Sequence, residues 1–191
     1  MKRTALAEAD AEGLFKKYYP GHADSPRGAP DKDIIEAVIL IKNTALMNIP
    51  GDRMIGALEL TARVFTAMTR AGVNIIMISQ SSSGANLSVV VDIHQLEKAE
   101  AALAAEFSGG PIRGRSHDKD TSVVMVVGSG MAGTPGVSAR VFSAMGQARI
   151  NVMMISQAAS EHNISFVVSS KDAEKAVQEL HREFWPYGVL S

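Results

Sequence analysis

The sequence predicts an α+β fold built from two small modules, each a four-stranded antiparallel sheet with two helices on one face. The first observation behind this prediction is an internal repeat. A shift of 77 positions aligns residues 45–107 with residues 122–184 without a gap, and about 26 of the 63 aligned positions are identical. The second is periodicity, because apolar residues in each copy switch between helical spacing and the alternation typical of strands. The third is size, since a chain of 191 residues accommodates two copies of this length.

Both copies predict the same order of elements: strand, helix, two strands and helix. The first copy is expected to form strands at 45–49, 73–79 and 87–91 and helices at 59–71 and 94–106. The second copy is expected to form strands at 122–127, 150–156 and 163–168 and helices at 136–148 and 172–184. Residues 34–41 predict an extra apolar strand, which a turn at 42–44 separates from the first copy and which should pair with a sheet. Residues 187–190 are a candidate for the closing strand of the second copy.

Proline and glycine indicate the domain boundaries. Residues 20–32 hold three prolines and two glycines and predict a linker, which follows a helix expected at 4–18. The predicted domains are an N-terminal helix and linker at 1–32, a first module at 33–116 and a second module at 117–191. A module of this size buries too little surface to be robust alone, so we expect the modules to pack together and the chain to form a homodimer.

Composition argues against several classes of function. A net charge of -1 and a pI near 6.5 give no basic surface, so neither nucleic acid nor a membrane is expected as a partner. The chain has no cysteine, which is consistent with a cytoplasmic location, and its first residues lack the apolar run of a secretory signal. The 5 histidines show no metal-ligand spacing, so no metal and no cofactor are expected.

The most characteristic segment of the chain is residues 128–168, GSGMAGTPGVSARVFSAMGQARINVMMISQAASEHNISFVV. The first copy has a similar segment at residues 51–91, GDRMIGALELTARVFTAMTRAGVNIIMISQSSSGANLSVVV. These segments resemble the ACT domain, a ferredoxin-like βαββαβ module that senses amino acids. Within that family they resemble the tandem regulatory region of threonine-sensitive aspartate kinases, including those fused to homoserine dehydrogenase. The resemblance covers residues 34–184. It implies a regulatory part and no enzyme, because the chain has no Lys-Phe-Gly-Gly segment and no room for a kinase domain.

The resemblance also implies where an effector binds, namely at the loop after the first strand and at the end of the second strand of each module. Loop glycines let backbone amides approach a ligand, and amides at a helix start favour a carboxylate. By resemblance the asparagine that opens the second strand addresses the ligand's amino group, and the glutamine that closes it is associated with threonine sensing. The alternative is that the two glutamines only satisfy the backbone of the hairpin turn. The predicted ligand-binding residues are Met131, Gly133, Gly136, Val137, Ser138, Asn151, Val152 and Gln157 in the second copy and Asn74, Ile75, Gln80 and Ser81 in the first.

The sequence therefore predicts a noncatalytic region that binds threonine or lysine and feeds back on an aspartate kinase catalytic domain, attached in cis or docked in trans. The alternative is a stand-alone ACT protein that serves as an oligomerisation or protein-interaction module without a ligand. The second copy should be the tighter site, because Glu59 stands where Gly136 leaves backbone access. Arg63 and Arg140, which the repeat aligns, are predicted to be structural, either along the sheet edge or in an intermodule ion pair.

Overall fold

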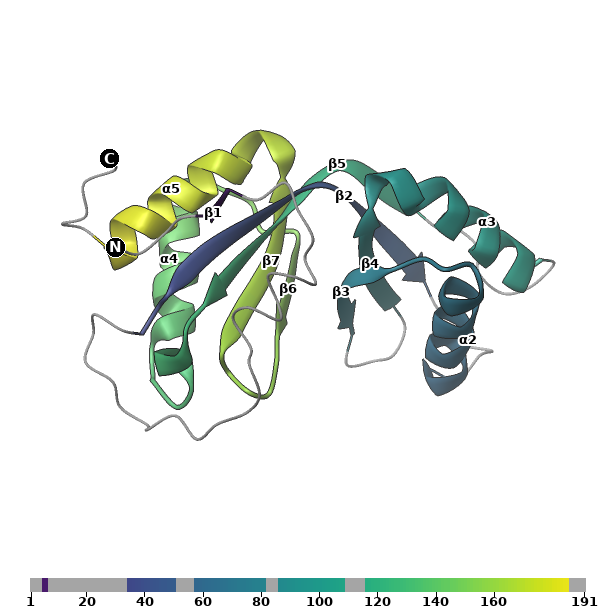
Figure 1. Cartoon of the computed structure of the whole chain (residues 1–191), viewed down its shortest axis with the longest axis horizontal. Coiled ribbons are helices and arrows are strands. Elements are labelled where there is room, and N and C mark those ends of the chain that lie inside the picture. The colour runs from purple at the N-terminus through teal and green to yellow at the C-terminus, as the bar shows by residue number, and fades with distance from the viewer. Residues whose placement is uncertain (1–4, 7–33, 51–56, 82–85, 109–115, 186–191) are drawn as a thin grey trace. The chain divides into compact units, whose positions relative to one another are not determined.

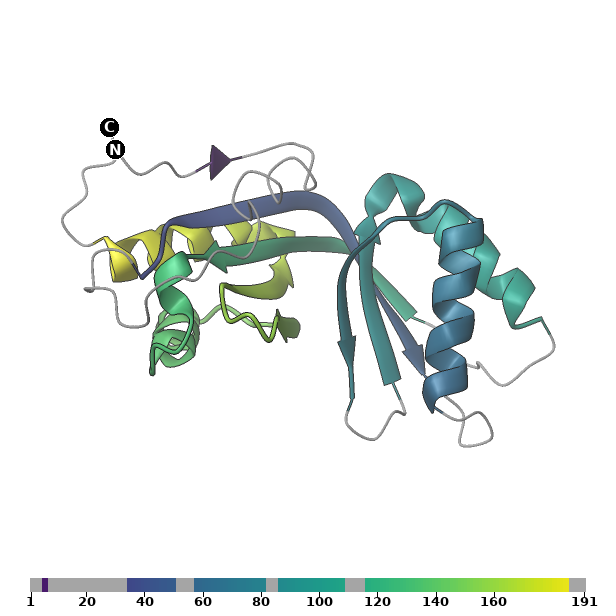
Figure 2. The same cartoon turned by 60° about the horizontal axis from the view of Figure 1, so that its bottom comes forward.

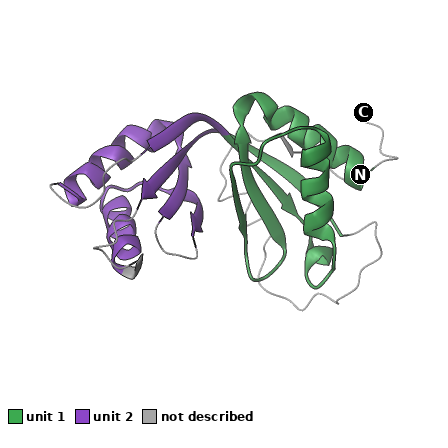
Figure 3. Cartoon of the chain, turned by 180° about the vertical axis from the view of Figure 1, so that it is seen from behind, with its two compact units in different colours: residues 1–42, 122–191 green, residues 43–121 purple. Residues whose placement is uncertain are grey.

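The computed structural model describes residues 5–6, 34–50, 57–81, 86–108 and 116–185 (Figure 1). The chain folds into two compact units, which Figure 3 colours separately. Unit 1 comprises Met1–Lys42 and Ser122–Ser191 and carries the second sequence copy. Unit 2 comprises Asn43–Thr121 and carries the first copy. Two long strands, β2 (Ala37–Pro50) and β5 (Ser116–Val127), run through both units.

Unit 2 is a sheet with strand order β3-β4-β2-β5 and two helices. Strand β4 (Asn86–Asp92) is antiparallel to both β2 and β3 (Ile75–Gln80), with Met47 opposite Val89 and Ser79 opposite Ser88. Helices α2 (Ala57–Arg70) and α3 (Leu96–Glu106) cover one face of the sheet, and the 3₁₀ turn η2 (Ile93–Gln95) leads into α3 (Figures 1 and 2). This arrangement confirms the predicted α+β fold for the first copy.

The core of unit 2 follows directly from the periodicity of its sequence. Leu60, Val64, Ala67 and Met68 recur at helical spacing on α2 and are buried. They pack with alternate residues of the sheet and with the inner side of α3, which include Ala45, Met47, Ile49, Leu87, Val89, Val91, Leu96, Ala99 and Leu103.

Unit 1 repeats this architecture with strand order β2-β5-β7-β6. Strands β6 (Met154–Gln157) and β7 (Asn163–Ser169) form an antiparallel hairpin. Helices α4 (Val137–Gln147) and α5 (Ala173–Phe184) cover one face (Figure 2). Two 3₁₀ turns, η3 (Ser129–Met131) and η4 (Ser170–Asp172), precede α4 and α5. A short strand, β1 (Ala5–Leu6), pairs in parallel with β2.

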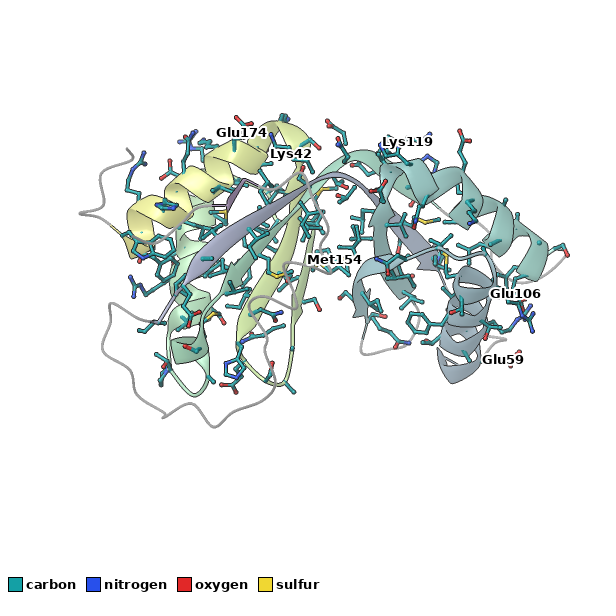
Figure 4. The ribbon with its side chains drawn as sticks, viewed as in Figure 1. Lys42, Glu59, Glu106, Lys119, Met154 and Glu174 are labelled. Atoms are coloured by element: carbon teal, nitrogen blue, oxygen red, sulfur yellow. The ribbon has the colours of Figure 1, made fainter. Side chains whose placement is uncertain are left out.

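Alternating residues of the sheet and one stripe of each helix form the core of unit 1. On α4 the buried residues are Val137, Val141, Ala144 and Met145, and on α5 they are Ala173, Ala176, Val177 and Leu180. Phe166 of β7 is completely buried beneath them, and its ring meets the ring of Phe142 edge to face at 5.7 Å. Lys42 at the edge of the unit binds Glu174 of α5 at 2.9 Å (Figure 4).

The turn expected at residues 42–44 is wrong, because these residues lie within strand β2. The strand continues from Ala37 to Pro50, and Asn43 passes through it with a positive φ of 58°. Thr44 and Thr121, which the repeat aligns with each other, hold β2 beside β5 through reciprocal bonds: each side-chain hydroxyl donates to the other residue's carbonyl, at 2.9 and 2.8 Å. Both threonines are buried, so these hydrogen bonds satisfy polar groups that would otherwise destabilise the sheet.

The predicted domain boundaries differ from the units that the chain forms. Residues 34–42, predicted as part of the first module, belong to unit 1, and residues 117–121 belong to unit 2. The physical reason is that the extra strand pairs with a sheet, as expected, but closes the sheet of the second copy. The closing strand expected at 187–190 lies outside the described residues. Ala5 and Leu6 form a strand where a helix was expected, and the rest of that predicted helix is also outside the described residues.

Candidate functional site

Unit 1 contains an open pocket of about 380 Å³ between the loop that joins β5 to α4 and the hairpin of β6 and β7. Six of the residues predicted for ligand binding line it: Met131, Gly133, Gly136, Val137, Ser138 and Gln157. Thr134, Pro135 and Glu161 complete the lining. The pocket therefore brings together the two segments that the sequence analysis had singled out, the loop after the first strand and the end of the second.

The loop from Gly128 to Gly136 owes its shape to local hydrogen bonds. The amide of Thr134 donates to the carbonyl of Met131 at 3.1 Å, and the Thr134 hydroxyl donates to the carbonyl of Gly130 at 2.7 Å. Gly133 and Gly136 have φ values of 67° and 89°, a region that side chains disfavour. The turn itself thus favours glycine at these two positions, so the glycine pattern is partly a structural signal.

The segment just before β2, residues 34–36, fixes the start of this loop from outside the second sequence copy. A side-chain carbon at Gly128 would lie 2.0 Å from the carbonyl oxygen of Ile34, so the two backbones meet at a distance that only glycine permits. The carboxylate of Glu36 accepts hydrogen bonds from the amide (3.0 Å) and the hydroxyl of Ser129. The Gly128 amide donates to the carbonyl of His162 at 3.0 Å. Sequence reasoning missed Glu36, because nothing local shows which loop the extra strand approaches.

The start of helix α4 presents backbone donors at the pocket. Gly136 is its N-cap and supplies no capping side chain, while its carbonyl accepts the first helical hydrogen bond from Arg140 at 3.0 Å. The first amides of a helix have no partner within the helix, and the helix dipole makes this end favourable for an anion. Val137 and Ser138, which carry such amides, both line the pocket. The pocket wall can therefore receive a carboxylate.

Ser138 and Gln157 add neutral polar side chains to the lining of the same pocket. Within the described part of the chain, neither side chain makes a hydrogen bond. In the first copy, the equivalent pair is Thr61 and Gln80, and there the Gln80 amide donates directly to the Thr61 hydroxyl at 3.1 Å. The same two positions are thus bridged in unit 2 and open to a ligand in unit 1.

The other predicted residues have structural roles or lie apart from the pocket. Asn151 is exposed, and Val152 packs on the core of unit 1. In the first copy the backbone N–H of Asn74 donates to the side-chain oxygen of Gln95 at 2.9 Å, and Ile75 packs on the core of unit 2. Ser81 and Asn86 exchange hydrogen bonds at the base of the hairpin. The first-copy loop at 51–56 lies outside the described residues.

Thr134, Pro135 and Glu161 line the pocket but were not among the predicted residues, and Glu161 is the charged one of the three. Its carboxylate accepts a hydrogen bond from the Gly133 amide at 2.6 Å, which joins the hairpin to the loop. Its backbone has a φ of 57° and closes a turn in which its amide donates to the carbonyl of Ala158 at 2.9 Å. The first copy has Gly84 at this position, so the repeat gave no signal for a carboxylate here.

Arg63 and Arg140 are structural, as predicted, but their partners lie within the same unit. Arg63 on α2 binds the Glu106 carboxylate on α3 at 2.8 Å (Figure 4 shows Glu106). The Arg63 guanidinium also stacks over the ring of Phe107, 4.4 Å from its centre. Arg140 repeats the arrangement in unit 1, with the Glu183 carboxylate at 2.8 Å and the Phe184 ring at 4.6 Å. Each arginine joins the two helices of its own unit, so the idea of an intermodule ion pair is wrong. Glu59 also reaches Arg63, at 3.8 Å.

The two groups with a shifted pKa, Glu174 and His181, lie outside the pocket lining. Lys42 donates a hydrogen bond to Glu174 and lowers the pKa of that carboxyl. Burial lowers the pKa of His181, whose ring lies 4.6 Å from the ring of Trp185. Among the described residues, no group of three or more His, Cys, Asp or Glu is placed to hold a metal ion. No helix of the described ranges has the length and apolar content to cross a membrane.

Comparison with known proteins identifies the family. The model of the ACT domain matches residues 47–107 and 124–184, which together make up more than half of the chain. The chain therefore belongs to the ACT domain family, with one domain in each sequence copy. This finding agrees with the fold of the two units and with the resemblance inferred from residues 128–168.

The relatives are regulatory regions of aspartate kinases and the enzymes that contain them. The chain is 36% identical over 152 residues to the bifunctional aspartokinase/homoserine dehydrogenase of Haemophilus influenzae, an alignment that covers 78% of this chain and 19% of that protein. It is 36% identical over 180 residues to a chloroplastic enzyme of the same name from Zea mays, covering 90% of this chain and 20% of that protein. The chain thus spans about a fifth of the length of these curated relatives.

Solved structures of similar fold include one of nearly the same extent. The regulatory subunit of aspartate kinase from Thermus thermophilus, in its ligand-free form, has a TM-score of 0.70 and 27% identity and covers 79% of this chain and 99% of that chain. Aspartate kinase from Synechocystis has a TM-score of 0.69 and 27% identity over 90% of this chain and 30% of that chain. The chain is therefore a tandem ACT region homologous to the regulatory regions of aspartokinases.

Proposed function

We propose that the chain is the effector-binding regulatory region of an aspartate kinase and that it mediates allosteric feedback by threonine or lysine in aspartate-family amino-acid biosynthesis. The observation that carries this proposal is the pocket of unit 1, which combines helix-start amides with the open pair Ser138 and Gln157. Homology to the regulatory subunit of an aspartate kinase supports it. The alternative, a stand-alone ACT module without a ligand, is not favoured by this homology.

The chemistry of the lining suits a small amino acid. A volume of about 380 Å³ lies at the small end of the range for ligand pockets. The ligand carboxylate would lie at the amides of Val137 and Ser138, where the helix dipole attracts an anion. A threonine hydroxyl can donate and accept, and so can the amide of Gln157, which makes threonine the first candidate. Lysine is the second, because its cationic side chain suits a pocket that contains Glu161.

The regulatory mechanism that we propose is a shift of population between two states of a kinase. The ligand stabilises the conformation of the loop and hairpin that surround it, and a kinase domain linked in cis or docked in trans is inhibited in that conformation. The coupling can be no larger than the difference in ligand affinity between the two states. On this proposal the chain itself phosphorylates nothing, and its partners are the effector and the kinase domain.

A homodimer in the cytoplasm completes the proposal. Ile78 on β3 and Ile155 on β6 occupy equivalent positions of the repeat and are 40% and 46% exposed. Both lie on edge strands, where unpaired backbone groups and apolar side chains favour association with a second chain. The absence of cysteine fits a reducing compartment.

Titration calorimetry of the purified chain with each of the twenty amino acids tests the proposal. We expect saturable heat from threonine, lysine or both, and one strong site per chain. The matched control is Gln80→Ala, which alters the equivalent glutamine in unit 2 and leaves the pocket of unit 1 intact. The absence of heat with all twenty amino acids would refute the sensor and favour the module without a ligand.

A further inference from the structure

We propose that Glu161 is the residue that makes the pocket selective for ligands with an α-ammonium group, so that the site accepts amino acids and discriminates against the corresponding acids without an amino group. This inference rests on the proposed function of the same pocket. It assigns a role to a side chain that neither the internal repeat nor the predicted site includes.

The first support is charge. Among the residues that line the pocket, Glu161 is the charged one. A carboxylate in the wall attracts a cationic group on a ligand and repels a further anionic group. The wall thus includes both a negative side chain and the first residues of a helix, which suits the two charges of a zwitterion.

The second support is the way in which the carboxylate is held. One oxygen, Oε2, accepts a hydrogen bond from the Gly133 amide at 2.6 Å. The other oxygen, Oε1, makes no hydrogen bond to any of the described residues. The bond to Gly133 orients the carboxylate on the pocket wall and leaves Oε1 for a ligand. A charge-assisted hydrogen bond from an ammonium group is about twice as strong as a neutral one.

The third support is the backbone conformation of Glu161. Its φ of 57° is in the left-handed region, which residues with a side chain disfavour. The first copy has glycine at this position, Gly84, the residue type that this region favours. Unit 1 therefore has a strained glutamate where glycine would be more stable, and at this position the strained residue lies in the pocket wall.

The test compares wild type with Glu161→Gln by calorimetric titration. The probes are L-threonine, L-lysine and 3-hydroxybutyrate, the analogue of threonine that lacks the α-ammonium group and has no other cationic group. Glutamine has the same shape and keeps an oxygen that can accept from Gly133, so the loop should stay tethered. Because Glu161 is exposed, we expect the loss to match the upper range for an exposed ion pair, about fivefold in affinity for the amino acid. The deaminated analogue should bind Glu161→Gln at least as well as wild type.

The matched control is Glu174→Gln, which removes an exposed carboxylate of unit 1 that binds Lys42 and lies outside the pocket lining. It should leave all affinities unchanged, and thermal unfolding should show that both variants are folded. The inference is overturned if Glu161→Gln binds the amino acid as tightly as wild type, or loses affinity equally for the amino acid and its analogue. If wild type binds neither amino acid, the proposed function fails together with this inference. Binding by wild type with no effect of Glu161→Gln refutes the inference alone.

Discussion

Replacing Gly136 at the start of α4 tests the position of the ligand carboxylate. We compare Gly136→Asp with Gly136→Asn, because the two side chains have the same shape and differ by one charge. Both residues tolerate the left-handed region better than other side chains do, so the φ of 89° costs the two variants a similar free energy. A side-chain carbon at this position meets no atom within 4 Å, so neither variant is expected to clash.

The added aspartate would lie beside the proposed position of the ligand carboxylate. Two like charges about 4 Å apart repel by about 1 kcal/mol in water and by about 4 kcal/mol near a typical protein surface. Because the pocket is open to solvent, we expect a value near the lower limit, about 1.4 kcal/mol, which is a tenfold loss of affinity. The same charge should make Gly136→Asp more stable than Gly136→Asn, because a negative charge at a helix start stabilises the helix by about 0.3–1 kcal/mol.

The assay is calorimetric titration of both variants with threonine and lysine, paired with thermal unfolding without ligand. The expected result is that Gly136→Asp is at least as stable as Gly136→Asn and binds about tenfold more weakly. Equal affinities of the two variants would show that the ligand carboxylate does not lie at the start of α4. Tighter binding by Gly136→Asp would show that this end of the pocket receives a cation.

Four further predictions concern the second copy, its core, its pH dependence and assembly. Gln157→Ala should weaken effector binding by about tenfold more than Gln80→Ala, because Gln80 already bonds within unit 2; equal losses in titrations would contradict this ranking. Phe166→Ala should lower the free energy of unfolding by about 3 kcal/mol in urea, because the ring is fully buried, and a loss below about 1 kcal/mol would argue against this core. Burial lowers the pKa of His181, so folding favours its neutral form. Its contribution to stability is therefore present above about pH 6.5 and is lost as the pH falls below that value. Unfolding followed by Trp185 fluorescence should show that the stability of His181→Asn falls less than that of wild type between about pH 7 and 5.5. Light scattering should give the mass of a dimer at micromolar concentration, and a monomer would refute the proposed homodimer.

The repeat was sufficient to predict two α+β modules, since it showed both the element order and the apolar faces of the helices. It could not show which sheet the extra strand joins. The nearly continuous apolar residues of 34–41 suit either sheet, and the observed choice brings Ile34 close to Gly128, far apart in the sequence. The expected turn at 42–44 was wrong for a related reason. Lys42 and Asn43 are polar and locally favour a turn, but the paired hydroxyls of Thr44 and Thr121 keep β2 and β5 continuous.

The candidate site could be predicted in part, because the loop and Gln157 follow a recognisable pattern. Glu161 could not be predicted from the repeat, since the aligned residue is Gly84 and a hairpin glutamate is usually a solvated charge. The difference between the copies could not be predicted either. The repeat aligns Gln80 with Gln157, but the Gln80 amide bonds the Thr61 hydroxyl, whereas Gln157 and Ser138 line the pocket of unit 1.

The central claim, that unit 1 holds an amino-acid effector in this pocket, can be tested by NMR titration of the isotopically labelled chain. Backbone amide shifts are followed while threonine and lysine are added in turn. The account predicts saturable changes at Gly133, Gly136, Val137 and Ser138 on one wall and at Glu161 on the other, with little change at Thr61 and Gln80 of unit 2. Changes confined to Thr61 and Gln80, or no change with either amino acid, would contradict it.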